Sequence, residues 1–318
     1  MMKRTMAVLL GLALTAHAGA QQPAPPQETD MAAVFAAQNK IPDTPGSGPY
    51  PALMEVDPGL PNYVIYRPAD LSGVERGKLG LFVWGNGGCA DDGASSRLHL
   101  SEIASHGYLV IAPGKWRNGP NAKDPPAPPR DLGQTPPTST EDLRRALDWA
   151  LAENGRQASR YAGMIDPKAV AVGGFSCGGV QALDLAGDPR IAALVIQNSG
   201  ILPEDAPRIA GMTIAKSALS KIHTPVIYIE GGPTDIAYAN GMDDFRRIDH
   251  VPAVMVNVKG VGHGGTYFEP NGGKAAEVAV DWLQWQLRGD TEAAKSFLGE
   301  ACGLCSDPAV EIERKNLR

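Results

Sequence analysis

The sequence has neither an excess of basic residues nor an apolar run long enough to cross a membrane, and each shortage excludes a class of function. Its 29 lysines and arginines are outnumbered by 35 aspartates and glutamates, which gives a net charge of −6. Nucleic-acid-binding proteins present a basic face, so this balance argues against a nucleic-acid partner. No apolar stretch approaches the roughly 18 residues of a membrane-spanning helix. We therefore expect neither nucleic-acid binding nor integral membrane association.

Cysteine is also scarce, and the 4 residues permit three disulfide pairings. Cys302 and Cys305 form a C-x-x-C motif with no second such motif and no nearby histidine, so a zinc site is not expected there. A redox motif of this type follows a strand and begins a helix, which this segment does not show, so a local structural disulfide is favoured. Cys89 and Cys177 remain, in loops expected to flank one site, and we hypothesise a second disulfide between them.

The amino terminus has the three parts of a secretory signal. Lys3 and Arg4 precede an apolar run over residues 6–16, and Ala18-Gly19-Ala20 follows as an A-x-A cleavage site. We expect cleavage near Ala20 and export to an oxidising compartment, as a secreted or periplasmic protein. Residues 21–50 are rich in proline and glutamine and are predicted to form a linker or a tail lying on the surface.

Strand-like and helix-like segments alternate over residues 51–290, which predicts one α/β domain followed by a tail over residues 291–318. Strands are predicted at residues 62–68, 79–84, 108–112, 169–172, 193–196, 226–229 and 253–258, and helices at residues 96–105, 142–153 and 275–287. Such alternation is typical of a doubly wound, mostly parallel sheet. The insertion at residues 203–223 is short, so we expect little or no lid.

The segment Gly174-Phe175-Ser176-Cys177-Gly178 fits the pattern G-x-S-x-G and lies between an apolar strand and an apolar helix. Glycines two residues either side of the serine allow the sharp turn that such a nucleophile needs. At the start of the helix, the Cys177 N–H is free to donate to an oxyanion. The sequence thus predicts Ser176 as a nucleophile, and the alternative is a glycine-rich turn with an idle serine.

Histidine positions single out one candidate base. In open sheets of this kind, ligands bind beyond the carboxyl ends of the strands, and His263 lies just past a strand between glycines. His99 is expected to be an ordinary, partly buried or solvated histidine. Asp235 follows the preceding strand and is predicted to orient the His263 imidazole. The alternatives are a plain turn histidine and an aspartate that caps a helix or faces solvent.

The chain order Ser176, Asp235, His263 is the order described for α/β-hydrolases, and residues 50–290 resemble that superfamily. The resemblance rests on the G-x-S-x-G segment, on Gly231-Gly232-Pro233-Thr234-Asp235 and on Gly262-His263-Gly264. The compact layout is similar to the dienelactone-hydrolase, chlorophyllase and polyester-hydrolase branches. Dienelactone hydrolases proper use a cysteine nucleophile, so the serine here does not support that particular activity.

The resemblance implies an exported carboxylic-ester hydrolase that acts through an acyl-enzyme on a small-molecule or polymeric ester, with no metal or organic cofactor. By similarity to the family's His-Gly-x turn, Trp84-Gly85-Asn86 would place the Asn86 N–H beside that of Cys177 in the oxyanion hole, with Trp84 where relatives often carry histidine. An exported serine peptidase and a catalytically inert binding protein, both with this fold, are the alternatives.

Overall fold

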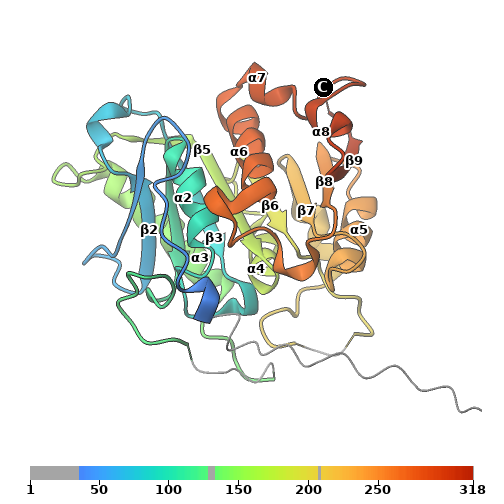
Figure 1. The fold of residues 1–318 in the computed structure, drawn as a ribbon, viewed down its shortest axis with the longest axis horizontal. Helices are drawn as coiled ribbons and strands as arrows, with labels where there is room; N and C mark the ends of the chain where they lie inside the picture. The colour runs from blue at the N-terminus through green and yellow to red at the C-terminus, as the bar shows by residue number, and fades with distance from the viewer. Residues whose placement is uncertain (1–35, 128–132, 207–208, 318) are drawn as a thin grey trace, which may run out of the picture.

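The computed structural model describes residues 36–127, 133–206 and 209–317, and a nine-stranded sheet runs through its centre (Figure 1). The predicted signal and residues 21–35 lie outside the described residues. The sheet has the order β1-β2-β4-β3-β5-β6-β7-β8-β9. In chain order the strands are β1 (Ala52–Glu55), β2 (Tyr63–Pro68), β3 (Leu79–Gly85), β4 (Tyr108–Pro113), β5 (Ile165–Phe175), β6 (Ala193–Gln197), β7 (Val226–Glu230), β8 (Ala253–Val258) and β9 (Val310–Lys315).

Neighbouring strands from β4 to β8 in this order pair in parallel, whereas β1, β2 and β9 pair antiparallel at the two sides of the sheet. All residues of β3, β4, β6, β7 and β8 are buried, as expected for parallel strands that helices cover on both faces. The predicted fold class, a doubly wound and mostly parallel α/β sheet, is confirmed.

Helices cover the sheet in two layers, as Figure 1 shows. One face carries α2 (Arg97–Ser105) and α6 (Gly273–Arg288), followed by the short α7 (Thr291–Ala294) and α8 (Gly303–Ser306). The other face carries α3 (Thr140–Gly155), α4 (Cys177–Leu185) and α5 (Tyr238–Arg247). Alternate strand residues point to opposite layers, so Phe82 packs in one core while Val83 packs in the other. Within the described residues no helix is long and apolar enough to cross a membrane.

The ends of α3 follow from local chemistry. The helix begins at Thr140 after the N-cap Ser139, whose backbone N–H and hydroxyl both bond the Asp142 carboxylate at 2.9 Å. This capping box satisfies amide groups that a helix start leaves open. Its apolar face then packs on the sheet, with Leu143 and Leu147 fully buried. The predicted helix is present and starts two residues earlier than expected.

Segments outside the predicted core also join the fold. Residues 38–48 lie against α2, where the buried Arg97 bonds Asp43 at 2.6 Å and Glu102 accepts a bond from the Ser47 N–H at 2.7 Å. Within the predicted tail, β9 pairs with β8 from Val310↔Val258 to Lys315↔Ala253. Its residues alternate between packed Val310 and Ile312 and exposed charged side chains, as an outer strand requires.

Both hypothesised disulfides are present. The first, here called the elbow disulfide, joins Cys89 and Cys177, and the second, the tail disulfide, joins Cys302 and Cys305. No helix was expected at the C-x-x-C motif, but α8 begins directly after Cys302. The motif nevertheless follows a loop and not a strand, and Cys302 Sγ accepts the Cys305 N–H at 3.1 Å as a cap of that short helix.

Candidate active site

Ser176 lies at the tip of a sharp turn between β5 and α4. Its φ of 53° and ψ of −120° lie in a region that L residues seldom occupy, so the surrounding structure must hold it there. The glycine spacing has a steric cause. A Cβ on Gly174 would lie 2.4 Å from the carbonyl carbon of Gly178, and one on Gly178 would lie 2.0 Å from that of Gly85. Only glycine fits at either position, which leaves the serine standing clear of the turn.

The turn sits where the strand order reverses. The chain leaves β3 for β4 and returns to β5 on the other side of β3, and Gly85 pairs with Gly174. Ligands of open α/β sheets bind at such a switch point, beyond the carboxyl ends of the strands. A cavity of about 170 Å³ opens there beside Ser176 and His263, with walls that include Leu202, Met212 and Ile236. Ile236 stands at the rim with 79% of its surface exposed.

His263 and Asp235 reach Ser176 from the ends of two neighbouring strands. Asp235 follows β7, and His263 lies in a short 3-10 turn, η4 (Gly262–Gly264), after β8. The His263 Nε2 lies 3.0 Å from Ser176 Oγ, and its Nδ1 lies 2.6 Å from Asp235 Oδ1. A carboxylate on Nδ1 fixes the tautomer that leaves Nε2 free to accept the hydroxyl proton. The structure therefore brings together all three residues that the sequence singled out.

Asp235 is held as an anion by four donors. Its side chain accepts bonds from His263, from the Ala237 and Gly231 N–H groups at 2.9 and 3.1 Å, and from Asn198 Nδ2 at 2.7 Å. Burial by itself raises the pKa of Asp235, but these hydrogen bonds outweigh it and lower the pKa to about 2. The carboxylate is thus charged at neutral pH and is oriented on both of its oxygens.

Asn198 belongs to the site and the sequence analysis did not single it out. Besides Asp235, its Nδ2 bonds the Gly262 carbonyl at 3.1 Å, and its Oδ1 accepts the Tyr267 hydroxyl at 2.9 Å. The residue is buried and has a φ of 44°, a left-handed conformation that asparagine tolerates better than most residues. The available signal was its place directly after β6, at the same edge of the sheet as Ser176, Asp235 and His263.

Glu230 is a second buried carboxyl group beside Asp235. Its Oε1 accepts the Ser199 N–H at 3.1 Å, and the Ser199 hydroxyl donates to the Ser176 carbonyl at 2.6 Å. Burial and then the charge of Asp235 raise the pKa of Glu230 well above its usual range. Glu230 is therefore neutral next to the charged Asp235, and it supports the backbone of the serine turn through Ser199.

The turn after β3 lies against the start of α4. It includes a 3-10 segment, η2 (Gly87–Cys89), and Gly88 forms part of the cavity wall. Asn86 is fully buried, and its Nδ2 donates to the carbonyls of Ala90 and Pro113 at 3.0 and 2.6 Å, which leaves its backbone as the part turned to α4. A Cβ on Gly178 would lie 2.5 Å from the Asn86 nitrogen. The oxyanion role of Asn86 and Cys177 stays a prediction.

His99 is not part of this group, but it is less ordinary than the sequence suggested. It is fully buried, with ring centroids 5.2 Å from Trp84 and 5.5 Å from Tyr267. Its Nε2 lies 3.2 Å from Gln197 Nε2. Burial lowers the pKa of His99 to about 3, so it packs as a neutral ring.

None of the protein-family models matches this chain, and no curated protein matches it. Within the described residues, no group of three or more histidine, cysteine, aspartate or glutamate side chains is arranged to hold a metal ion.

Proposed function

We propose that this protein is an exported serine hydrolase that cleaves carboxylic esters through an acyl-enzyme on Ser176. The observation that carries the proposal is the chain of contacts from Ser176 Oγ to His263 Nε2 at 3.0 Å and from His263 Nδ1 to Asp235 Oδ1 at 2.6 Å. This constellation, at the tip of a strand–turn–helix elbow, is the arrangement described for α/β-hydrolases, and the mostly parallel sheet is compatible with that fold.

The first half of the reaction forms the acyl-enzyme. Ser176 Oγ attacks the acyl carbon while its proton passes to His263 Nε2, and Asp235 stabilises the imidazolium that results. The N–H groups of Cys177 and Asn86 donate to the oxyanion of the tetrahedral intermediate. Each such donor contributes about 3 kcal/mol of transition-state stabilisation in enzymes of this type. As the intermediate collapses, the bond to the leaving oxygen breaks, and that oxygen takes the proton from His263 Nε2 and departs as the alcohol.

The second half of the reaction releases the acid. Water enters the space of the departed alcohol and gives a proton to His263 Nε2 as its oxygen attacks the acyl carbon. The second tetrahedral intermediate collapses, the acid leaves and Ser176 recovers its proton. The strained backbone at Ser176 keeps the nucleophile pointed into the cavity throughout both steps, so little reorganisation is needed at the moment of reaction.

Export is part of the same proposal. Two disulfides in one chain are typical of proteins that leave the reducing cytosol. They agree with the secretory signal expected at residues 1–20.

The proposal is tested by the hydrolysis of p-nitrophenyl acetate and butyrate by the mature protein, by Ser176→Ala and by Ser220→Ala. Ser220 is exposed, bonds only the nearby Ser217 carbonyl and lies outside the site, so it is the matched control. We expect kcat to fall by about 10⁴-fold or more in Ser176→Ala and to stay unchanged in Ser220→Ala. Equal turnover by wild type and a folded Ser176→Ala would refute the proposal. Failure of a fluorophosphonate probe to label the folded wild-type protein would favour an inert binding protein.

A further inference from the structure

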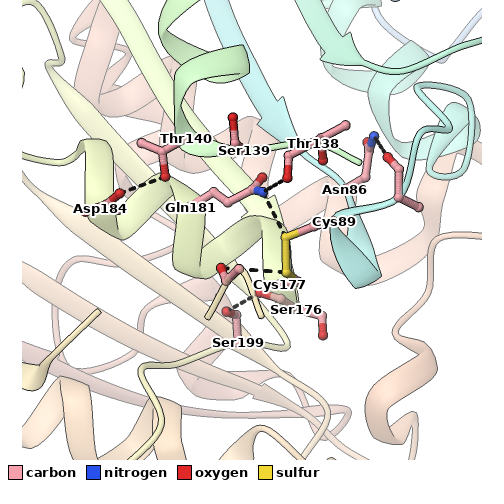
Figure 2. Close-up of a disulfide and its surroundings, with 12 residues drawn as sticks. Asn86, Cys89, Thr138, Ser139, Thr140, Ser176, Cys177, Gln181, Asp184 and Ser199 are labelled. Atoms are coloured by element: carbon pink, nitrogen blue, oxygen red, sulfur yellow. Dashed lines mark hydrogen bonds between the residues drawn. A yellow bond between two sulfur atoms is a disulfide. The ribbon is translucent and has the colours of Figure 1, made fainter. Parts of the chain in front are cut away.

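We infer that the elbow disulfide is a positioning element that holds the two sides of the oxyanion hole together, an inference that rests on the proposed function. Cys177 is the residue after Ser176 and the first residue of α4, and Cys89 ends the turn that follows β3. Their Cα atoms lie 5.3 Å apart (Figure 2). The bond therefore joins the two backbone segments that would supply the oxyanion donors.

The turn after β3 has a backbone conformation that its residues do not favour by themselves. Gly88 and Cys89 have φ values of 61° and 49°, so two successive residues are left-handed. Glycine adopts this region freely, but a residue with a side chain does so at a cost, because its Cβ approaches the following carbonyl. A glycine-rich segment with a cysteine in this conformation would explore other shapes unless its neighbours restrained it. Hydrogen bonds within the turn, from the Cys89 N–H to the Asn86 carbonyl and from the Ala90 N–H to the Gly87 carbonyl, supply part of the restraint, and contacts from outside the turn add to it.

Several contacts converge on Cys89 to supply that restraint, and Figure 2 shows them around the sulfur pair. The Cys89 carbonyl accepts the Thr138 N–H at 3.2 Å. Gln181, on α4 one turn after Cys177, places its Nε2 2.8 Å from Cys89 Sγ and donates to the Thr138 carbonyl at 2.8 Å. The start of α3, the start of α4 and the turn after β3 thus meet at the disulfide.

Besides the disulfide and the contacts of Gln181, a close backbone contact joins the turn to the elbow. Gly85 and Gly178 touch so closely that neither has room for a side chain, but such a contact does not prevent sliding. Asn86 lies between that contact and Cys89 in the sequence, and Cys177 is next to Gly178. The glycine contact and the disulfide therefore close a ring around both expected donors and fix the distance between them.

The elbow disulfide is buried, which protects it from reduction in the folded protein. Cys89 and Cys177 have exposed fractions of 0% and 2%, so a thiol reductant in solution does not reach the bond while the protein is folded. A disulfide that only stabilised the fold would change the unfolding temperature and leave turnover alone. Loss of a disulfide that positions the donors should instead lower kcat and leave KM unchanged, because the oxyanion forms only as the transition state is reached.

The test compares two variants that each lack one disulfide, Cys89→Ala/Cys177→Ala and the matched control Cys302→Ala/Cys305→Ala. Each is assayed below its own unfolding temperature with p-nitrophenyl butyrate. Cys177→Ala keeps the backbone donor. We expect kcat to fall by about 10²-fold in the elbow variant, with KM within about twofold, since an ångström of donor misplacement costs about that much. Affinity for an alkylboronic acid, which forms a tetrahedral adduct on serine, should fall in parallel. The tail variant should retain wild-type kcat.

Two results separate this inference from the proposed function. A wild-type protein without turnover would overturn the proposed function and the inference with it. A folded elbow variant with wild-type kcat and wild-type boronic-acid affinity would overturn the inference alone. If the alanine pair does not fold, Cys89→Ser/Cys177→Ser keeps side chains of nearly the same size without a β-branch at the left-handed position 89, and the same comparison of kcat is made with that variant.

Discussion

Asn198 offers the most direct quantitative test of how the site is held together. The residue joins Asp235, Gly262 and Tyr267 through three hydrogen bonds, and its φ of 44° is left-handed. Replacing Asn198 by glycine removes the side chain, and glycine adopts the left-handed backbone conformation without a steric cost. Replacing it by alanine removes the same hydrogen bonds and adds a Cβ that the left-handed conformation disfavours. The pair of variants therefore separates the side-chain contribution from the backbone contribution.

The expected losses follow from the contacts. Asn198→Gly removes a charge-assisted hydrogen bond to Asp235, worth about 1.5–3 kcal/mol, and leaves the buried Tyr267 hydroxyl without its acceptor, at about 1–3 kcal/mol. The free energy of unfolding should therefore fall by about 2.5–6 kcal/mol. Asn198→Ala should lose about 1 kcal/mol more, the cost of the left-handed conformation for a residue with a Cβ. Both substitutions also remove one of the four hydrogen-bond donors to the Asp235 carboxylate, which raises the pKa of Asp235.

Urea unfolding at pH 7, followed by circular dichroism, measures both differences, and ester hydrolysis on the same samples measures kcat. We expect the stability order wild type, Asn198→Gly, Asn198→Ala, with kcat reduced in both variants because the Asp235 carboxylate is no longer oriented from that side. An alanine variant as stable as the glycine variant would refute the argument about the backbone. A glycine variant within 1 kcal/mol of wild type would refute the argument about the hydrogen bonds.

Three further predictions concern stability. Replacing both cysteines of the elbow disulfide, which are 88 residues apart, by alanine should lower the free energy of unfolding by about 4–5 kcal/mol. The same change at the tail disulfide, whose cysteines are 3 residues apart, should lower it by about 2 kcal/mol, because a shorter loop restricts the unfolded chain less. Equal losses in urea titrations would contradict this dependence on loop length. Because burial raises the pKa of Glu230 in the folded protein, the stability of wild type relative to Glu230→Gln should fall as the pH rises above the ordinary range of a glutamate, by at most about 1.4 kcal/mol per pH unit. A constant difference would contradict the raised pKa. In the folded protein the pKa of His99 is about 3, whereas in the unfolded chain His99 takes up a proton near the ordinary pKa of a histidine. The stability of wild type relative to His99→Gln should therefore fall by about 1.4 kcal/mol per pH unit as the pH drops from 6 to 4. Parallel stability curves for the two proteins would contradict the lowered pKa.

The parts of the fold that the sequence predicts are those with strong local patterns. Strands β3, β4, β6, β7 and β8, and β5 over residues 169–174, are buried on both faces, so each is a nearly continuous run of apolar residues and glycine. The serine turn was visible because steric need restricts residues 174 and 178 to glycine. Asp235 and His263 could be placed because a parallel sheet brings the carboxyl ends of its strands to one edge.

The parts that the sequence did not predict depend on contacts between distant segments. β9 alternates packed and charged residues like any solvated segment, and only its pairing with β8, about fifty residues earlier, makes it a strand. Asn198 and Gln181 are single polar residues whose roles depend on what lies across from them. Nothing local to Asn198 reveals that Asp235 and the Tyr267 hydroxyl converge on it, because that convergence exists only in the folded chain.

Strand β9 also protects the edge of the sheet from pairing with another chain. Without it, β8 would present an unpaired row of N–H and C=O groups along residues 253–258, flanked by apolar side chains, which is a template for pairing with another chain. β9 covers that row and places the exposed charges of Glu311, Glu313 and Arg314 along the outer side. Like and unlike charges spaced in this way discourage a second sheet from docking in register. Proteolytic loss of residues 310–315 would therefore replace a charged edge strand by an apolar one and favour aggregation.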